Sequence, residues 1–366
     1  DHHDCPVLWV DNEDRLHFLY KCHNEPGIHL VCKQPGTMGA SEKDWKTLPD
    51  ISDKVSYPTM FALPGARHLV YFREAGHSSS WSYRVTADNG RTWTGPENSV
   101  TNLDIYNHPE WSSYQAKILS PDKKTLYVVF TDYDDVKSND PERLYNPKYD
   151  MPVSNEWKYN LSLLKVDPDT HEVRNDAGEL MKTPLDIETV REKCHIWNTE
   201  WRGAGVPPAL CLDENGYPAA LHVLSEDNLQ THTYYYVRKV GDEWRKTVIT
   251  ASNHQWNSSY LKRDADGTLH AYVIVGDSYM DKPGVNYTHG GGRIAHWIST
   301  DKGYNWRFER EITPDPAQYP GWSFNNVQPV VRPDGSIVDG MLIFYGWLDS
   351  TRPDGVAFLL DESKPA

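Results

Sequence analysis

Two stretches of the chain follow one pattern: TADNGRTW from Thr86 to Trp93 and STDKGYNW from Ser299 to Trp306. Both read S/T-x-D-x-G-x-x-W. In this pattern the aspartate can accept hydrogen bonds from the backbone N–H groups of a turn, and the glycine can adopt a positive φ. The tryptophan can pack beneath the turn. The repetition therefore indicates a recurring turn, which is a structural feature and not a catalytic one.

Most of the remaining chain consists of short runs in which apolar and polar residues alternate, as they do in half-buried strands. Examples are RLHFLYKC, HLVYFRE, TLYVVFTDY and TLHAYVIVG, and turn signals such as LPGA, DENG and DADG separate the runs. Helical periodicity is scarce, and Pro184–Cys194 is the best candidate for a short helix. The polar, proline-containing segment Pro141–Ser154 predicts a long loop inserted between two strands.

Many short strands with recurring turns predict the fold class. Repeats of roughly 40–50 residues are typical of β-propellers, in which each blade is a four-stranded sheet. The 366 residues correspond to about seven such units. We therefore predict an all-β, seven-bladed β-propeller that forms a single domain over residues 1–366.

The overall charge limits the classes of partner. The chain has 37 Lys and Arg against 52 Asp and Glu, a formal net charge of −15. Nucleic-acid-binding proteins normally present a basic face, so we expect no nucleic-acid partner. An acidic polysaccharide remains compatible with the charge, because a local basic pocket can lie in an acidic protein. The sequence has no run of eighteen apolar residues, so we expect no membrane span.

Several features favour a secreted protein. The first residues, DHHDCP, look like a processed or trimmed N-terminus. Three N-x-S/T triplets, at Asn160, Asn257 and Asn286, favour an extracellular glycoprotein. Cys22 and Cys32 flank a plausible hairpin, so they form either a cross-strand disulfide or two buried thiols.

The sequence gives little evidence for a metal. A structural zinc would have to come from cysteines and histidines whose spacing matches no compact motif, so buried thiols and core histidines are the better interpretation. These residues are Cys194, His195, Cys211, His222 and His232. A calcium ion in the central channel of a propeller is a further option, but the sequence does not show its ligands.

The repeated pattern resembles the Asp-box of sialidase-type β-propellers, which lies on the hairpin between the last two strands of a blade. Residues 1–24, 56–93 and 290–306 are similar to the BNR-4 group of propellers, and the resemblance extends to about Trp347. That group includes ulvan lyases, rhamnose–glucuronate lyases that act on gum-arabic-type chains, and a related α-L-rhamnosidase family. The chain lacks an FRIP-like N-terminal motif, which argues against a sialidase.

The resemblance implies cleavage of the bond between rhamnose and glucuronate by β-elimination, which leaves an unsaturated uronate. Such chemistry needs a cation at the uronate carboxylate, a base for the C5 proton and an acid for the leaving oxygen. No cofactor is required for these steps. In the family a cluster of His, Tyr and Arg side chains performs them. We expect a monomeric enzyme that acts on ulvan or on an arabinogalactan.

The resemblance implies specific site residues. His77, after the YFREAG strand, and Tyr159, in NEWKYNLSLL, would handle the two proton transfers, in an order that the sequence leaves open. Arg174, one hairpin later, would hold the carboxylate and lie near Tyr159. His108 would be a second histidine of the site. Tyr159 could also be a packed ring and Arg174 a solvated charge, and His108 fits a structural role better.

Other residues are candidates for substrate binding: Arg73, Trp111 and Arg293. Trp197, Trp201 and Trp256 could also stack on sugar rings, or they could be core residues. Three glycines in HGGGR allow close approach to a ligand, or they form a bulge before the second Asp-box strand.

Two alternative functions remain. One is an α-L-rhamnosidase-type hydrolase on the same propeller, for which His3 or His23 would be the candidate residue. The other is a non-catalytic carbohydrate-binding propeller. A hydrolase would release saturated sugar, whereas a lyase would leave an unsaturated uronate.

Overall fold

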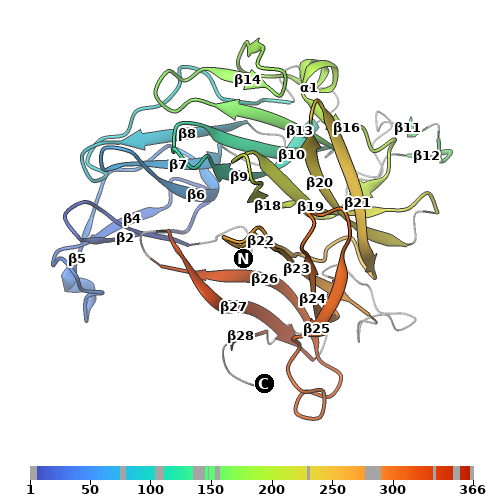
Figure 1. The fold of residues 1–366 in the computed structure, drawn as a ribbon. Helices are drawn as coiled ribbons and strands as arrows, with labels where there is room; N and C mark the ends of the chain where they lie inside the picture. Colours follow the sequence, from blue (N-terminus) through green and yellow to red (C-terminus); the bar gives the residue numbers. More distant parts are fainter. Residues whose placement is uncertain are drawn as a thin grey trace.

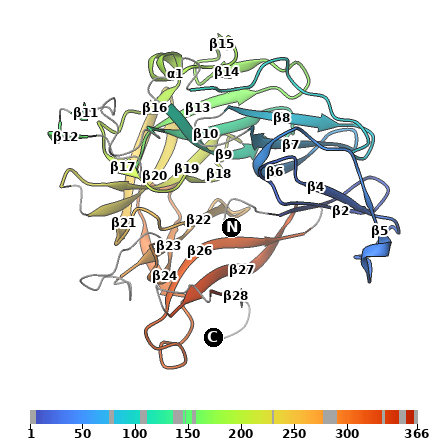
Figure 2. The same ribbon diagram turned by 180° about the vertical axis from the view of Figure 1, so that it is seen from behind.

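The computed structural model describes residues 6–74, 80–103, 111–134, 145–146, 148–152, 157–228, 231–276, 290–332, 335–348 and 355–362. In this part of the chain antiparallel strands dominate. They form six main sheets that follow one another around a common centre, from the blue N-terminal sheet to the red C-terminal one (Figure 1). Figure 2 shows the same ring from behind.

The strands of each sheet are consecutive or nearly so in the chain. The first sheet consists of β1 (Val7–Val10), β2 (Leu16–Tyr20), β4 (Ile28–Cys32) and β5 (Trp45–Thr47). The second consists of β3 (His23–Glu25), β6 (Val55–Leu63), β7 (Arg67–Arg73) and β8 (Trp81–Thr86). A short 3-10 helix, Glu42–Asp44, precedes β5.

The third sheet is the largest. Its main path consists of β9 (Trp111–Leu119), β10 (Leu126–Asp134), β13 (Lys158–Val166), β14 (Val173–Asn175) and β15 (Leu180–Met181). Two further strands, β16 (His195–Trp197) and β17 (Gly203–Ala204), pair with β13. A separate hairpin of β11 (Tyr145–Asn146) and β12 (Met151–Pro152) lies within the predicted loop Pro141–Ser154.

Three sheets complete the described part. The fourth consists of β18 (Ala209–Leu212), β19 (Pro218–Ser225), β20 (His232–Val240) and β21 (Glu243–Ser252). The fifth consists of β22 (Tyr260–Arg263), β23 (Leu269–Val275), β24 (Arg293–Ser299) and β25 (Arg307–Glu311). The sixth has β26 (Ser323–Val331), β27 (Ile337–Trp347) and β28 (Val356–Asp361).

The β-propeller prediction is confirmed, but the number of blades was wrong. Within the described residues five sheets have four or more strands and form blades, and β26–β28 is a three-stranded sheet. The prediction divided the chain length evenly. The third sheet with its connections instead extends from Trp111 to Ala204. Its additional strands and helix α1 use the residues that the even division assigned to further blades.

The short helix was predicted correctly. Helix α1 extends from Ile187 to Lys193, within the expected Pro184–Cys194, and lies at the outer edge of the third sheet (Figure 1). Asp186 is its N-cap, and the Asp186 carboxylate accepts a hydrogen bond of 2.7 Å from the backbone N–H of Thr189. Such caps stabilise the first turn by satisfying a free N–H group.

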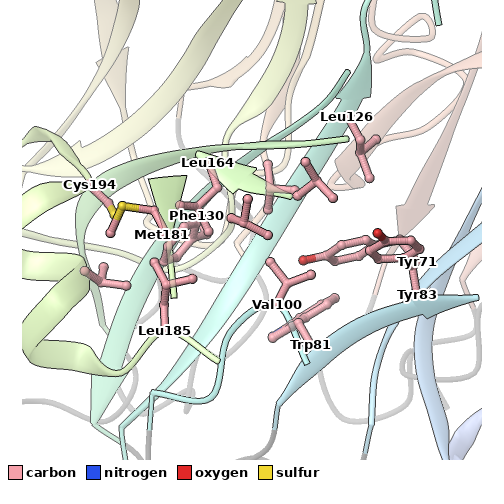
Figure 3. Packing of buried hydrophobic residues seen from close by; sticks show 14 of the residues in the cluster. Tyr71, Trp81, Tyr83, Val100, Leu126, Phe130, Leu164, Met181, Leu185 and Cys194 are labelled. Carbon is pink, nitrogen blue, oxygen red and sulfur yellow. The ribbon is translucent and has the colours of Figure 1, made fainter. Parts of the chain in front are cut away.

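Apolar side chains from neighbouring sheets fill the space between the blades. Tyr71, Trp81 and Tyr83 of the second sheet pack with Leu126 and Phe130 of the third (Figure 3). These positions alternate along their strands, which places every second side chain in the core. Burial of apolar area between sheets is therefore what holds the ring together.

Both Asp-boxes have the predicted structural role. The Asp88 carboxylate accepts a hydrogen bond of 2.8 Å from the Thr92 N–H, and that of Asp301 accepts one of 2.9 Å from the Asn305 N–H. Gly90 and Gly303 have φ of +77° and +80°. Each glycine also lies against the preceding sheet: a Cβ on Gly90 would be 2.7 Å from His29 Cε1, and one on Gly303 would be 2.2 Å from Tyr236 Cε1. The boxes therefore shape hairpins and join blades.

Two sheets share a further repeated feature, an Asp–His–His relay. His17 Nδ1 lies 3.0 Å from His29 Nε2, and His17 Nε2 lies 3.0 Å from Asp11 Oδ2. In the fifth sheet His270 Nδ1 lies 2.9 Å from His296 Nε2, and its Nε2 is at an ion-pair distance of 3.0 Å from Asp264. The strand register is the same in both relays: the second histidine lies opposite the residue two positions after the first.

Burial in these relays lowers the pKa of the second histidine of each relay. Desolvation lowers the pKa of His29 to about 3 and that of His296 to about 4. Both imidazoles are therefore neutral near neutral pH. Trp9 stacks on His17, with ring centroids 4.8 Å apart, and Tyr272 stacks on His296 at 4.4 Å.

The structure decides between two alternatives that the sequence left open. Cys32 is a buried free thiol, so the interpretation as buried thiols holds and the Cys22–Cys32 disulfide is not formed. Asn160 and Asn257 are buried and hydrogen-bonded, at distances of 3.1 and 3.0 Å to Asp132 and Ser252, so neither can carry a glycan in the folded protein. Asn286 lies outside the described residues. None of the described helices is long and apolar enough to span a bilayer.

Candidate active site

Cationic and aromatic side chains gather at one end of the blades. Arg73 is the last residue of β7, and Lys158 is the first residue of β13. Tyr57 and Tyr114 lie near the starts of β6 and β9. The Asp-box turns follow the ends of β8 and β24, so the antiparallel topology places these four residues at the opposite end of the blades.

Arg73 is the central residue of this cluster. Its side chain has 0% exposure, and its guanidinium carbon lies 4.7 Å from the Tyr57 ring centroid and 5.8 Å from that of Tyr114. Its Nε and Nη1 atoms have no hydrogen-bond partner among the described residues. A buried cation that lacks a paired anion carries a large desolvation cost. Arg73 therefore has the properties of an anion-binding residue.

The backbone conformation at Tyr57 directs its side chain toward Arg73. Tyr57 has a φ of +53°, an unfavourable value for an aromatic residue, at a register shift between Ser56 and Thr59. Bulges of this kind redirect side chains, and strained residues concentrate at functional sites. The hydroxyl oxygens of Tyr57 and Tyr114 are 3.4 Å apart. Two phenols that share a hydrogen bond beside a guanidinium can transfer a proton between themselves and a bound substrate.

Lys158 extends the cluster beyond Tyr114. Its Nζ lies 5.2 Å from the centroid of Tyr114, 5.1 Å from Tyr133 and 4.4 Å from Trp256. Tyr114 and Tyr133 stack with centroids 5.2 Å apart. Interactions with aromatic faces stabilise an ammonium group that is shielded from water.

Two of the predicted catalytic residues do not come together. Tyr159 has 2% exposure, packs on Trp201 at 5.3 Å and belongs to the hydrophobic core between the second and third sheets. Arg174 lies opposite Lys165, six positions along β13 from Tyr159, or about 20 Å at 3.3 Å per residue. It is half-buried and pairs with Glu172 at 2.8 Å. The predicted proximity of Tyr159 and Arg174 is therefore wrong, because β13 is longer than a short hairpin arm.

The remaining predicted site residues differ in burial, and some lie outside the described part of the chain. Trp111 is buried, and the Arg191 guanidinium lies 4.1 Å from its ring. Arg293 is exposed and pairs with Glu311 at 3.3 Å. His77 and His108 lie outside the described residues, as does His3. Their assigned roles stay predictions.

Beside the cluster, Asp132 forms a buried polar network with the third sheet. It accepts hydrogen bonds of 2.8 Å from Arg191 and 3.1 Å from Asn160. His195 Nε2 lies 3.9 Å from the Asp132 carboxylate, yet burial lowers the pKa of His195 below its ordinary value. The carboxylate is thus compensated by Arg191, and His195 is neutral near pH 7. The network joins β10, β13 and α1.

The sequence pattern does not indicate Tyr57, Tyr114 and Lys158 as site residues. No local motif marks them, since each stands in an ordinary strand sequence. What they share is their position: each lies near the start of a strand, at the same end of the blades. Among the described residues no group of three or more His, Cys, Asp or Glu side chains could hold a metal ion.

A model of the BNR repeat-containing family, BNR_4, matches residues 1–252. This chain belongs to the BNR_4 family. The BNR_4 chain is 22% identical over 329 residues to a protein named ulvan lyase from Nonlabens ulvanivorans, covering 83% of this chain and 63% of that protein. It is 25% identical over 135 residues to Ulvan Lyase-PL25 of Pseudoalteromonas sp. (strain PLSV), covering 32% of this chain and 27% of that protein. It thus spans less than two thirds of the length of these relatives.

Solved structures have the same fold as this BNR_4 chain. A PL25 ulvan lyase superposes with a TM-score of 0.73 at 17% identity, covering 99% of this chain and 80% of that one. A PL25 ulvan lyase bound to -[GlcA(1-4)Rha3S]- superposes with a TM-score of 0.72 at 16% identity over the same shares. At this identity the likeness establishes the propeller fold alone.

Proposed function

We propose that this BNR_4 chain is the catalytic propeller of a polysaccharide lyase that cleaves an acidic polysaccharide by β-elimination. The similarity to proteins named ulvan lyase supports this reaction class. The single observation in the molecule that carries the proposal is Arg73, a buried guanidinium between two tyrosines, two of whose nitrogen atoms have no hydrogen-bond partner among the described residues.

Arg73 suits the most demanding step of the reaction. The proton at C5 of a uronate is acidic only when positive charge or hydrogen bonds neutralise the adjacent carboxylate. The planar guanidinium can bind a carboxylate through two parallel N–H groups. In a site shielded from water this interaction also stabilises the charge that develops on the carboxylate as the C5 proton leaves.

We assign the proton transfers to the Tyr57–Tyr114 pair. One phenol oxygen, as phenolate, takes the C5 proton; the electron pair forms the C4–C5 double bond, and the C4–O4 bond breaks. The leaving O4 receives a proton from a phenol. The 3.4 Å separation of the hydroxyls allows the proton to be returned between them after each turnover. This assignment replaces Tyr159, whereas a part for His77 stays a prediction.

The substrate is proposed by its chemistry. A uronate next to a deoxy sugar, the rhamnose–glucuronate bond, gives both the carboxylate for Arg73 and a leaving O4. One PL25 structure that shares the fold contains a GlcA–Rha3S chain. Ulvan and arabinogalactan both present such a bond. The reaction needs no cofactor, and we further propose a monomer that acts outside the cell, where these polysaccharides occur.

The test is the ultraviolet absorbance of unsaturated uronate during incubation with ulvan and, separately, with gum arabic. We expect signal from the wild type, and a loss of roughly 100-fold or more in kcat/KM for Arg73→Gln, as when one group that stabilises transition-state charge is removed. Arg73→Lys should recover little, because an ammonium lacks the planar fork. Arg174→Gln is the matched control and should retain full activity.

Three outcomes would overturn the proposal. If Arg174→Gln lost activity while Arg73→Gln kept full activity, the carboxylate would bind at Arg174 on β14 and not at Arg73. Free rhamnose without unsaturated uronate would indicate the rhamnosidase alternative, for which His23 is exposed on β3. Binding without any product would indicate a non-catalytic propeller.

A further inference from the structure

Trp256 lies at the far end of the cationic and aromatic cluster. It belongs to the connection between β21 and β22, and its side chain is half-buried. One part of the ring lies against the Lys158 ammonium, whose Nζ is 4.4 Å from the ring centroid. The connection therefore places an aromatic surface from between the fourth and fifth sheets against the third.

Together these residues form a continuous cluster at the ends of the blades. Arg73 and Lys158 lie 5.8 and 5.2 Å from the same Tyr114 centroid, so these two cations are at most 11 Å apart. Trp256 follows directly after Lys158. Sugar rings are roughly 5 Å across, comparable to the spacing of adjacent strands. Lys158, and Trp256 beside it, therefore lie within reach of a sugar next to one whose carboxylate is bound at Arg73.

The backbone of Trp256 is held on both sides. Its N–H donates to His254 Nδ1 over 3.1 Å, and its carbonyl accepts a hydrogen bond of 3.1 Å from Asn325 Nδ2. Asn325 is a buried residue of β26, and its Oδ1 also accepts from the Ser258 N–H over 2.9 Å. The sixth sheet thus fixes the backbone around Trp256 through one asparagine.

The glycines of the HGGGR segment stabilise the same connection. The Gly291 N–H donates to Asn257 Oδ1 over 2.7 Å, and the Gly291 carbonyl accepts from Asn253 Nδ2 over 2.8 Å. A Cβ on Gly290 would lie 2.4 Å from Asn257 Oδ1. These glycines permit the close approach of the connection.

We propose that Trp256 is a sugar-stacking residue of a subsite adjoining the Arg73 site, and that Asn325 is its positioning residue. This inference rests on the proposed function. The exposed part of an indole offers an apolar face for a sugar ring, and a tryptophan held rigidly loses little entropy on binding. The subsite takes a neutral or acidic sugar next to the cleaved uronate, so longer chains bind more tightly than short ones.

The experiment compares chain lengths. Steady-state kinetics are measured with polymeric ulvan and with the shortest ulvan oligosaccharide that the wild type cleaves. We expect Trp256→Ala to raise KM for the polymer roughly tenfold, the effect of one well-packed aromatic contact, and to leave kcat nearly unchanged. The KM for the short substrate should change less than twofold. Trp297→Ala, the same truncation near the Asp-box end of β24, is the matched control and should not change either KM.

The positioning role of Asn325 is tested by a separate variant. Asn325→Ala should raise the polymer KM in the same direction as Trp256→Ala, and the double variant should add little to either. Additive effects of Asn325→Ala and Trp256→Ala would overturn the positioning role. An equal KM change for long and short substrates, or none, would overturn the stacking subsite.

The subsite can be tested separately from the reaction. Binding of an ulvan oligosaccharide to the inactive Arg73→Gln variant is followed by tryptophan fluorescence, with and without Trp256→Phe. Loss of most of the ligand-dependent change in Trp256→Phe supports the subsite even if wild-type protein releases no unsaturated product. An unchanged signal would contradict the subsite, even if the lyase activity is found.

Discussion

The substitution Gly303→Ala tests whether the Asp-boxes join neighbouring blades. The new methyl group would lie 2.2 Å from Cε1 and 2.4 Å from Cδ1 of Tyr236, a residue with 1% exposure in the core of the fourth and fifth sheets. The ring also packs edge-on against Trp306, with centroids 5.4 Å apart. The Tyr236 ring must therefore shift against its core neighbours to admit the methyl group.

Two costs add in this variant. An alanine at φ +80° costs about 1–2 kcal/mol, and overpacking of a filled core costs about 1–3 kcal/mol. We expect the free energy of unfolding to fall by about 2–5 kcal/mol. With an unfolding entropy of about 2.1 cal/mol/K per residue over 366 residues, a loss of about 3 kcal/mol lowers the Tm by about 4 °C.

Gly241→Ala is the matched control for this prediction. Gly241 has a φ of +62°, and a methyl group added to it would have no atom within 4 Å, so its substitution carries the backbone cost alone. Urea unfolding and thermal scans of both variants give the difference, which should be about 1–3 kcal/mol. If Gly303→Ala destabilises the protein no more than Gly241→Ala does, the Asp-box does not pack tightly on the preceding blade.

Other predictions follow from burial. The pKa values of His29, about 3, and His296, about 4, lie below the unfolded value of about 6.5, so the unfolded state binds more protons between these values. The protein therefore keeps its full free energy of unfolding above pH 6.5. Below that pH the free energy of unfolding falls, by about 2 kcal/mol per histidine at pH 5. Equal urea midpoints at pH 5 and 7.5 would contradict this prediction. Expression in a glycosylating host should leave Asn160 and Asn257 unmodified in peptide mass spectra, whereas a glycan on folded protein would contradict their burial. Burial raises the pKa of Cys211 to about 12, so this thiol should react with a disulfide reagent only after unfolding; rapid labelling in native buffer would contradict the core position.

Local patterns in the sequence determined local structure. The Asp-box turns at Asp88 and Asp301 are built from hydrogen bonds within eight residues, so their pattern alone predicts their geometry. The same holds for the capped helix Ile187–Lys193 and for the alternating strands. The fold class follows from these elements, and the family resemblance indicates lyase chemistry.

Only the tertiary structure decided the number of blades and the composition of the site. Arg73, Tyr114 and Lys158 come from three strands, and their proximity depends on how two sheets pack in the ring. Tyr159 and Arg174 are close in sequence, yet they lie about 20 Å apart because β13 continues between them. Sequence spacing limits the separation of residues within a turn. Between strands the separation is set by register and burial, which depend on residues far away in the chain.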